Sequence, residues 1–243
     1  AAAQTGIPKI KEFNTGDNFG NAYFQMNQRS GKRWSAARAF LDTAQKRQNL
    51  TVMTEAMVQK LALEHTDKGL VATGVHVLHK GQAQLITANK EVLLAAGAVA
   101  SPQILQLSGI GAPELLQQHG IEAKRELPGV GNNLQDHLQI RTIYSVDNTV
   151  TLNRRAKYPW GMAKMGLEYF FNKTGPMTMP PSQLGAFAKS DSSQASANIE
   201  WHVQPLSLDA FGSPLHKYDA ITPSVCNLRP SSRGSISITS TDP

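Results

Sequence analysis

Apolar and polar positions alternate along several short stretches in the first half of the chain, a pattern typical of β-strands with one buried face. Turn residues separate three of these stretches, because 66–69 reads Thr-Asp-Lys-Gly and 80–81 reads Lys-Gly. The pattern therefore predicts a small antiparallel meander preceded by one further strand. The predicted strands cover residues 50–54, 56–64, 70–79 and 82–88.

A different pattern follows at 91–97, where apolar residues run almost without interruption and end in glycine. Such a run is typical of a central strand that is covered on both faces in an α/β sheet. Ser101 and Pro102 then predict the cap and the first position of a helix that ends just before Gly109. This order of strand, tight turn and helix N-terminus predicts an α/β unit.

Two more helices and a change of architecture are predicted outside this region. Ser35 precedes a helix-forming run, and Pro113 begins a short helix that ends at Gly120. Residues 127–133 are rich in turn formers and contain two glycines, so we expect their backbone to lie close to another group. After residue 138 we predict a second domain, with a helix at 158–172, a loop at 174–182, and strands at 139–146, 198–203 and 235–239.

The composition is that of a globular chain, with 40% hydrophobic and only 17% charged residues among 243. The net charge of +6 and the pI near 9.5 would favour an acidic partner such as nucleic acid. The basic residues are scattered, however, and the tightest groups, 32–33 and 154–157, are not interleaved with the aromatic side chains of a single-strand binding surface. We therefore expect a solvated basic surface and no nucleic-acid partner.

Single features exclude several other classes of protein. The one cysteine, Cys226, rules out an internal disulfide framework and a Cys-x-x-Cys metal site. No apolar run approaches the roughly 20 residues that span a bilayer. The first residues lack the pattern of a signal peptide, and both ends look cut from a longer chain. The sequence does not specify a compartment, and a cytoplasmic location is favoured.

Candidate chemistry is concentrated at two pairs of residues. Asp136 and His137 have the composition of an acid–base pair. Glu200 and His202 lie two residues apart in a predicted strand and share one face, which either borders a substrate pocket or is a solvent-facing polar strip. Because no third ligand stands at a suitable spacing, no metal site is predicted there.

One glycine pattern suggests a nucleotide site and does not meet its requirements. Residues 109–114 read Gly-Ile-Gly-Ala-Pro-Glu, which begins like a dinucleotide fingerprint. Glutamate occupies the place of the third glycine, and the pattern follows a predicted helix instead of a strand. We therefore do not assign phosphate binding to it.

A longer run carries a resemblance to a known family. Residues 97–111 read Gly-Ala-Val-Ala-Ser-Pro-Gln-Ile-Leu-Gln-Leu-Ser-Gly-Ile-Gly, which resembles the second signature of the glucose-methanol-choline (GMC) oxidoreductases. Further blocks resemble the same family in the same order, so the resemblance covers nearly the whole chain. These blocks are 31–38, 49–52 with Val58, 127–137, 174–176 and 229–234.

The resemblance implies an α/β fold that is α+β overall. Residues 31–137 would form part of a FAD-binding Rossmann-like domain, and 138–243 part of an antiparallel-sheet substrate domain. Residues 1–30 would be an N-terminal segment on the substrate-domain side.

The resemblance also implies an activity. Members of the family are FAD-dependent enzymes that oxidise a small-molecule alcohol by hydride transfer to flavin, and this chain most resembles choline-dehydrogenase-like members. The family's proton-accepting histidine belongs to a region that no segment here matches, so no catalytic residue is assigned. The expectation is an internal fragment, inactive alone, that lacks N- and C-terminal segments of the enzyme. The alternative is a non-catalytic ligand-binding module. The alcohol and the electron acceptor are not specified.

Cofactor-binding positions carry over from the family residue by residue. Val58 would place its backbone at the adenine ring of FAD, although a valine in a strand is as readily a core residue. Asp136 and His137 would position a loop near the flavin, the alternative being a purely structural hydrogen-bonding role. The full set of implied FAD-binding residues is Val58, Ala96, Gly97, Ser101, Asp136 and His137.

Overall fold

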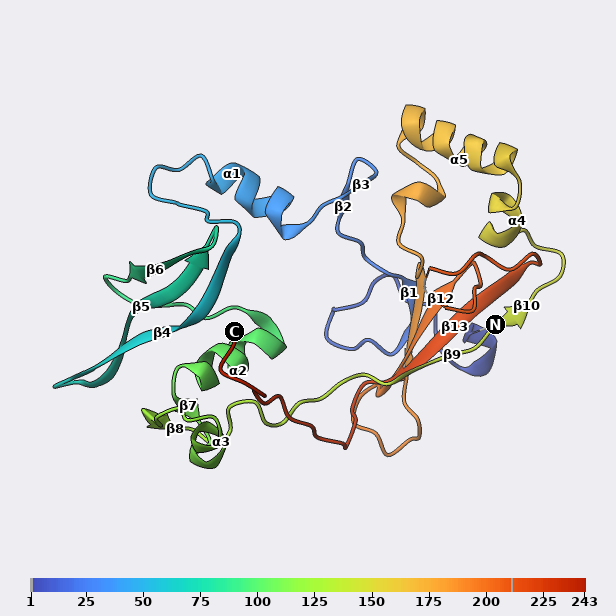
Figure 1. The fold of residues 1–243 in the computed structure, drawn as a ribbon. Coiled ribbons are helices and arrows are strands. Elements are labelled where there is room, and N and C mark those ends of the chain that lie inside the picture. Colours follow the sequence, from blue (N-terminus) through green and yellow to red (C-terminus); the bar gives the residue numbers. More distant parts are fainter. Residues whose placement is uncertain (1, 211) are drawn as a thin grey trace. The chain divides into compact units, whose positions relative to one another are not determined.

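The structure is a computed structural model that describes residues 2–210 and 212–243, and it divides into two units (Figure 1). Unit 1 consists of Ala1–Gln48 and His137–Pro230, and unit 2 consists of Asn49–Asp136 and Ser231–Pro243. Neither unit is a continuous stretch of sequence. Helices are mixed with antiparallel sheets in the chain, in agreement with the expected α+β class.

An antiparallel sheet forms the centre of unit 1 (Figure 1). Its strand order is β1-β11-β12-β13-β10, and β9 also pairs with β13. Alternate residues of β13 are buried, which is the burial expected of a strand with one covered face. The strands are β1 (Gly20–Tyr23), β9 (Gln139–Arg141), β10 (Tyr144–Ser145), β11 (Leu184–Ala188), β12 (Ile199–Gln204) and β13 (Ala220–Asn227).

The remaining elements of unit 1 are short, except for one helix. The predicted helix at 158–172 is confirmed as α5 (Pro159–Asn172), which begins with proline at its first turn and ends at Lys173 in the left-handed region (φ 54°). A helical segment also follows Ser35, as predicted. The short elements are η1 (Ala2–Thr5), β2 (Gln28–Arg29), β3 (Lys32–Arg33), the π-helical η2 (Ala37–Leu41), α1 (Asp42–Ala44), α4 (Leu152–Ala156) and η3 (Pro176–Thr178).

Unit 2 contains the predicted meander, which is confirmed as the antiparallel sheet β4-β5-β6. An apolar cluster of Leu61, Ile104 and Ile110 joins this sheet to the helix that follows it. The predicted helix beginning at Pro113 is confirmed as well. The elements are β4 (Ala56–Thr66), β5 (Gly69–His79), β6 (Gln82–Thr87), α2 (Gly97–Leu107), β7 (Ile110–Gly111), α3 (Pro113–Gln118) and β8 (Arg125–Glu126).

Three predicted strands are wrong, namely 50–54, 91–97 and 235–239. A strand is defined by backbone hydrogen bonds to a neighbour, and none of the described residues pairs with these segments in a ladder. Leu93, at the centre of the apolar run, is 80% exposed. Its neighbours Val92 and Leu94 pack against the apolar cluster of unit 2, so one side of the segment is covered and the other is not.

The start of α2 also differs from the prediction. The helix begins at Gly97, so Ser101 and Pro102 lie inside it instead of at its cap. The Ser101 hydroxyl accepts a hydrogen bond from the backbone N–H of Ala96 (3.1 Å), the residue before the helix. The predicted end is correct, because Gly109 follows the helix in a left-handed conformation (φ 83°).

The two units do not follow the expected domain boundaries at two places. Residues 31–48 group with unit 1, where the backbone of Gly31 packs against Lys173 so closely that a Cβ atom would overlap its carbonyl oxygen. Residues 231–243 group with unit 2, where the Gln106 side chain bonds the backbone of Ile236 and Ile238. Local composition gives no indication of either long-range contact.

Candidate functional site

The N-terminus of α2 lies in unit 2 and brings together three of the predicted cofactor-binding residues, Ala96, Gly97 and Ser101. Gly97 has a left-handed conformation (φ 86°), and a Cβ atom built on it would meet nothing within 4 Å. The side chains at this bend are small and exposed. The space beside Gly97 is therefore open.

A cavity of about 430 Å³ borders the same helix. It is lined on one side by Ser101 and Pro102 and on the other by the loop at 130–135. The loop backbone does lie close to another group, as its two glycines predicted, because a Cβ atom on Gly131 would overlap the carbonyl oxygen of Ile236. That contact is internal to the protein, so Gly131 shapes the cavity without indicating a ligand.

Val58 lies on β4, opposite Val77, and packs against the apolar cluster of unit 2. The register of β4 shifts between Val58 and Lys60, which locally disturbs the backbone pairing at this point. A buried hydrogen bond from the Leu61 backbone to the Ser108 hydroxyl (2.8 Å) ties β4 to the end of α2. The side chain of Val58 thus has a core role, and its backbone role toward adenine stays a prediction.

Asp136 and His137 lie at the division between the units, since Asp136 ends one segment of unit 2 and His137 begins the second segment of unit 1. Both residues are exposed. The proposed positioning of a flavin-side loop by this pair stays a prediction.

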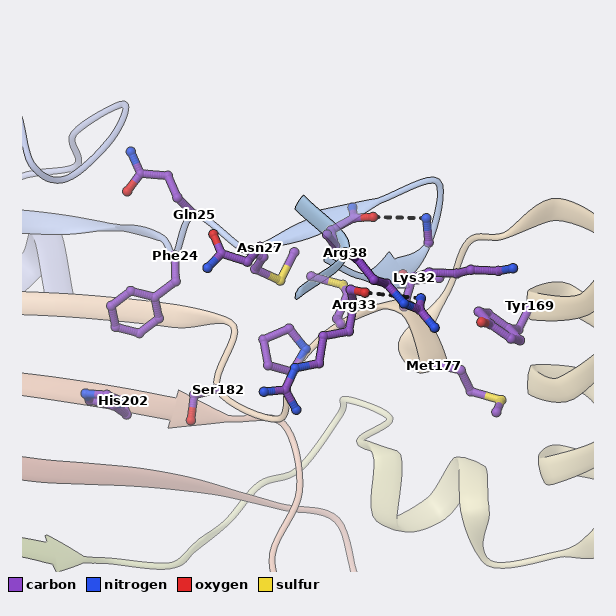
Figure 2. Close-up of a pocket in the computed structure, with 16 residues that line it drawn as sticks. Phe24, Gln25, Asn27, Lys32, Arg33, Arg38, Tyr169, Met177, Ser182 and His202 are labelled. Carbon is purple, nitrogen blue, oxygen red and sulfur yellow. Dashed lines mark hydrogen bonds between the residues drawn. The ribbon is translucent and has the colours of Figure 1, made fainter. Parts of the chain in front are cut away.

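Unit 1 contains a larger cavity, of about 940 Å³ (Figure 2). The β2–β3 hairpin and η2 supply Lys32, Arg33 and Arg38, while α5 supplies Tyr169 and β12 supplies His202. The guanidinium of Arg38 donates to the carbonyl oxygen of Arg33 (3.4 Å), which holds the two cationic residues together.

The cavity is positively charged. Three of its lining residues carry a permanent positive charge, and no aspartate or glutamate lines it within the described part of the chain. Methionine, phenylalanine and proline side chains supply apolar wall, which is the mixed lining typical of a small-molecule site. The arrangement favours a ligand that is neutral or negatively charged.

Glu200 and His202 are confirmed to share one face of a strand. The His202 Nε2 atom lies 2.9 Å from a carboxylate oxygen of Glu200, and their side chains are only 33% and 13% exposed, respectively. His202 also lines the unit 1 cavity and packs beside Phe24 with a ring separation of 5.2 Å. His202 therefore borders the cavity and Glu200 is largely buried, which is not the exposure of a solvent-facing strip.

The strand pairing brings a third polar side chain beside Glu200 and His202 that the sequence spacing did not indicate. The register of β12 and β13 places Cys226 opposite Glu200, and the Cys226 thiol donates to the second carboxylate oxygen of Glu200 (3.7 Å). Ligand atoms of Glu200, His202 and Cys226 all lie within 4.8 Å of one another. Burial raises the pKa of the Cys226 thiol, and the neighbouring Glu200 charge raises it further.

Several residues of these sites were not found from the sequence. Lys32, Arg33 and Arg38 were interpreted as scattered surface charge, and Cys226 was considered only for disulfides. Lys32 and Arg33 are adjacent on β3 and Arg38 follows on η2, so their closeness in sequence could have indicated a local group of cations. The approach of Cys226 to Glu200 depends on pairing between strands 26 residues apart, which no local pattern specifies.

Comparison with protein families identifies the chain. The sequence profile described as GMC oxidoreductase matches residues 1–139, more than half of the 243 residues. The chain belongs to the GMC oxidoreductase family. The resemblance seen at residues 97–111 is thereby confirmed. Solved structures similar to this chain include an enzyme described as FAD-dependent.

Curated relatives of this GMC chain include oxygen-dependent choline dehydrogenases. The protein from Yersinia pestis (strain Pestoides F) is 38% identical over 251 residues, which cover 100% of this chain and 42% of that protein. The protein from Escherichia coli O139:H28 is also 38% identical and is covered to 43%. The chain thus spans less than half the length of the curated relatives it matches.

Solved structures agree with the fold over nearly the whole chain. An FAD-dependent oxidoreductase from Chaetomium thermophilum has a TM-score of 0.82 at 23% identity, over 99% of this chain and 48% of that one. Pyridoxine 4-oxidase from Mesorbium loti has a TM-score of 0.77 at 26% identity, over 99% and 43%. These matches support the expected combination of a partial flavin-binding fold and an antiparallel sheet. No helix in the described residues is long and apolar enough to cross a membrane.

Proposed function

We propose that this chain forms part of an FAD-dependent oxidoreductase that oxidises an alcohol. The observation that carries the proposal is the open bend at Ala96 and Gly97, which leads into the 11-residue helix α2. The first-turn N–H groups of a helix have no intrahelical acceptor, and the helix dipole is positive at this end. These features suit a polar or anionic group of a dinucleotide.

The residues of this chain hold the reactants. The bend at Gly97 and the cavity beside Ser101 would accept part of the nucleotide, while the cavity in unit 1 would accept the alcohol. FAD, when bound, supplies the acceptor for the hydride that leaves the alcohol carbon. We assign the removal of the hydroxyl proton to no described histidine, because the family's base belongs to a region that this chain does not match.

The charge of the unit 1 cavity suggests the class of alcohol. Lys32, Arg33 and Arg38 would repel a quaternary ammonium group, and none of the described lining residues supplies a carboxylate to offset them. We therefore propose a neutral or anionic alcohol as the substrate, although curated relatives are named choline dehydrogenases.

Flavin binding is tested on the whole gene product that carries these residues. We expect it to purify with bound flavin whose absorbance is bleached by an alcohol without oxygen. Gly97→Val should lower the bound flavin, because its side chain would occupy the opening. Gly120→Val is the matched control, since Gly120 is also left-handed (φ 67°) with open space at its Cβ but lies outside the bend. Equal flavin content in the two variants would contradict the proposed cofactor site.

The substrate class is tested on the same protein with three alcohols of similar size, one anionic, one neutral and one quaternary ammonium alcohol. We expect Arg33→Gln to raise KM for the anionic alcohol, with little effect on the neutral one. A preference for the quaternary ammonium alcohol that Arg33→Gln leaves unchanged would contradict the proposed substrate class, and would leave flavin binding intact.

The 243-residue chain alone is expected to bind FAD weakly or not at all, and to oxidise no alcohol. The glycine-rich turn with which the family cradles the pyrophosphate has no counterpart in this sequence. Adding FAD and a dye acceptor to the purified chain checks this expectation. Binding of an anionic alcohol without FAD would favour the alternative of a non-catalytic ligand-binding module.

A further inference from the structure

One face of the unit 1 sheet brings together a set of polar side chains that the proposed oxidation does not use. The register pairs Glu200 with Cys226 and His202 with Ser224, and residues directly opposite in an antiparallel pair project from the same face. Four polar side chains from two strands therefore form one contiguous group. Two of them, Ser224 and Cys226, are almost fully buried, at 1% and 4% exposure.

The spacing within this group matches the requirements of a metal ion. Distances from Glu200 to the ligand atoms of His202 and Cys226 are 2.9 and 3.7 Å, and all three ligand atoms lie within 4.8 Å. Two ligands of one tetrahedral Zn²⁺ lie about 3.5 Å apart, given metal–ligand bonds of about 2.0 to 2.3 Å. Side-chain adjustments of less than about 1 Å would therefore complete the site.

A second observation is independent of these distances. The Ser224 hydroxyl is buried in this face and has no hydrogen-bond partner among residues 2–210 and 212–243. A buried polar group without a partner is costly, and an unfilled ligand position is one of the few explanations. Ser224 lies opposite His202 and two residues from Cys226, so its hydroxyl belongs to the same group.

The charges of the group also favour a divalent cation. The Glu200 carboxylate and a Cys226 thiolate would together neutralise the ion, with His202 as a neutral ligand, so the buried site would carry no net charge. Arg141 lies opposite Ser224 on the same face, where its guanidinium donates to the Gln204 side chain (3.4 Å). The His202 side chain is 33% exposed, so the group is accessible from solvent.

We propose that Glu200, His202 and Cys226 form a binding site for a divalent transition metal, with Zn²⁺ as the best-matched ion. The mixture of thiolate, imidazole and carboxylate is the ligand set that Zn²⁺ accepts, whereas Mg²⁺ and Ca²⁺ require oxygen ligands. On binding, the thiol proton is released to solvent and the bond between the Cys226 sulfur and the metal replaces the S–H bond. The fourth position is left to Ser224 or to water.

The test uses Co²⁺ as a spectroscopic substitute for Zn²⁺ in the full 243-residue chain. Because Cys226 is the single cysteine, a thiolate-to-cobalt charge-transfer band can arise from this residue alone. We expect the band to appear at one equivalent of Co²⁺ and to disappear on adding Zn²⁺. Zn²⁺ should also raise the Tm of the chain, since a ligand that binds the native state stabilises it.

Variants distinguish the site from surface binding. Cys226→Ser should abolish the band and the rise in Tm. Glu200→Gln should weaken binding more than about 100-fold, because even the loss of a residue that only supports a ligand costs about 10- to 100-fold. His65→Gln is the control, since His65 is an exposed histidine of unit 2 and its loss should leave the affinity unchanged.

Two results would overturn the proposal. One is the lack of a thiolate band at saturating Co²⁺ in a chain whose circular dichroism is that of a folded protein. The other is an equal Zn²⁺-dependent rise in Tm for the unaltered chain and Cys226→Ser. Either result would show that Cys226, Glu200 and His202 are a hydrogen-bonded polar group without a metal.

Discussion

Different interactions stabilise the interior of each of the two units. In unit 1 the largest fully buried side chains are all polar, namely Asn153, Thr222, Ser207 and Ser224, whereas unit 2 fully buries Leu116 as well as Gln106 and builds an apolar cluster from leucine and isoleucine. Hydrogen bonds depend on direction as well as distance, and apolar packing depends mainly on shape. Unit 1 is thus the unit whose geometry is fixed more narrowly by hydrogen bonds, and it is also the unit that contains the larger cavity.

Asn153 shows how this fixing works. Its amide nitrogen donates to the carbonyl oxygens of Ser207 and His216, both at 3.0 Å, and its oxygen accepts from the Ser207 backbone N–H at 2.8 Å. One side chain thereby satisfies three backbone groups of a segment more than 50 residues away. The comparison teaches that removing single polar groups should damage unit 1 as much as cavity-forming substitutions damage unit 2.

The largest effect is expected for Asn153→Leu. The substitution keeps the size of the side chain but leaves the Ser207 N–H and the His216 carbonyl oxygen without these partners, at about 1 to 3 kcal/mol each. We expect the free energy of unfolding to fall by about 4 kcal/mol, measured by urea denaturation. Asn172→Leu at the exposed end of α5 is the control and should have little effect. If Asn153→Leu lowered the free energy of unfolding by less than the control does, buried hydrogen bonds would not be what distinguishes unit 1 from unit 2.

The next largest effect is expected for Leu116→Ala in unit 2. Leu116 is fully buried, so truncation leaves a cavity and should cost about 3 kcal/mol. Hydrogen exchange should show the loss of protection in α3 and its neighbours within unit 2. Undiminished protection there would show that apolar packing does not carry the stability of this unit.

Gln106→Leu tests a buried polar contact in unit 2 of the kind that unit 1 contains. Its side chain donates to the Ile236 carbonyl oxygen (3.1 Å) and accepts from the Ile238 N–H (2.9 Å). We expect a loss of about 2 kcal/mol from the unpaired backbone groups, seen as faster hydrogen exchange at Ile238. Gln103→Leu, in the same helix and only half-buried, is the control.

A smaller effect is expected for Thr222→Val on the buried face of β13. The exchange keeps the shape but removes the hydrogen bond from the Thr222 hydroxyl to the Leu206 carbonyl oxygen (2.8 Å). We expect a loss of about 1 kcal/mol by urea denaturation. A stabilised variant would indicate that the shape of this side chain matters more than its hydroxyl.

The smallest effect concerns pH. The backbone N–H of Thr151 lowers the pKa of Asp219, and the Thr151 hydroxyl and the Arg154 guanidinium act in the same direction. Because the folded-state pKa is below the unfolded value, the stabilisation is complete above about pH 4 and is lost as the pH falls through the folded-state pKa. We expect Asp219→Asn to flatten the acid limb of a pH titration of stability. An unchanged acid limb would exclude Asp219 as its source.

Local sequence patterns predicted those elements whose ends are marked by turn residues or by proline. The meander has turn residues between its strands, and α5 and α3 each begin with proline, so their positions followed from short stretches of sequence. The segment at 91–97 failed because strand formation requires a neighbour, which is a property of the sheet and not of the segment. Ser101 was predicted to precede the first turn of α2, but the helix begins at Gly97 and the Ser101 hydroxyl accepts a hydrogen bond from the Ala96 N–H.

The candidate sites were predicted unevenly for the same reason. Ala96, Gly97 and Ser101 are adjacent in sequence, so a family motif could indicate them together. Cys226 reaches Glu200 only through the pairing of β12 with β13, and Lys32, Arg33 and Arg38 share a cavity with His202 of β12. Contacts of this kind follow from long-range register, which periodicity does not specify.

The interleaved order of the two units has a consequence for biosynthesis. Residues 231–243 emerge from the ribosome after all of unit 1, yet Gln106 holds their backbone beside a helix made more than a hundred residues earlier. Until residues 231–243 have been synthesised, the Gln106 amide can form hydrogen bonds only to water in place of the backbone of Ile236 and Ile238. A stop codon placed shortly before Ser231 would release a chain in which the final step of closing this unit could never occur.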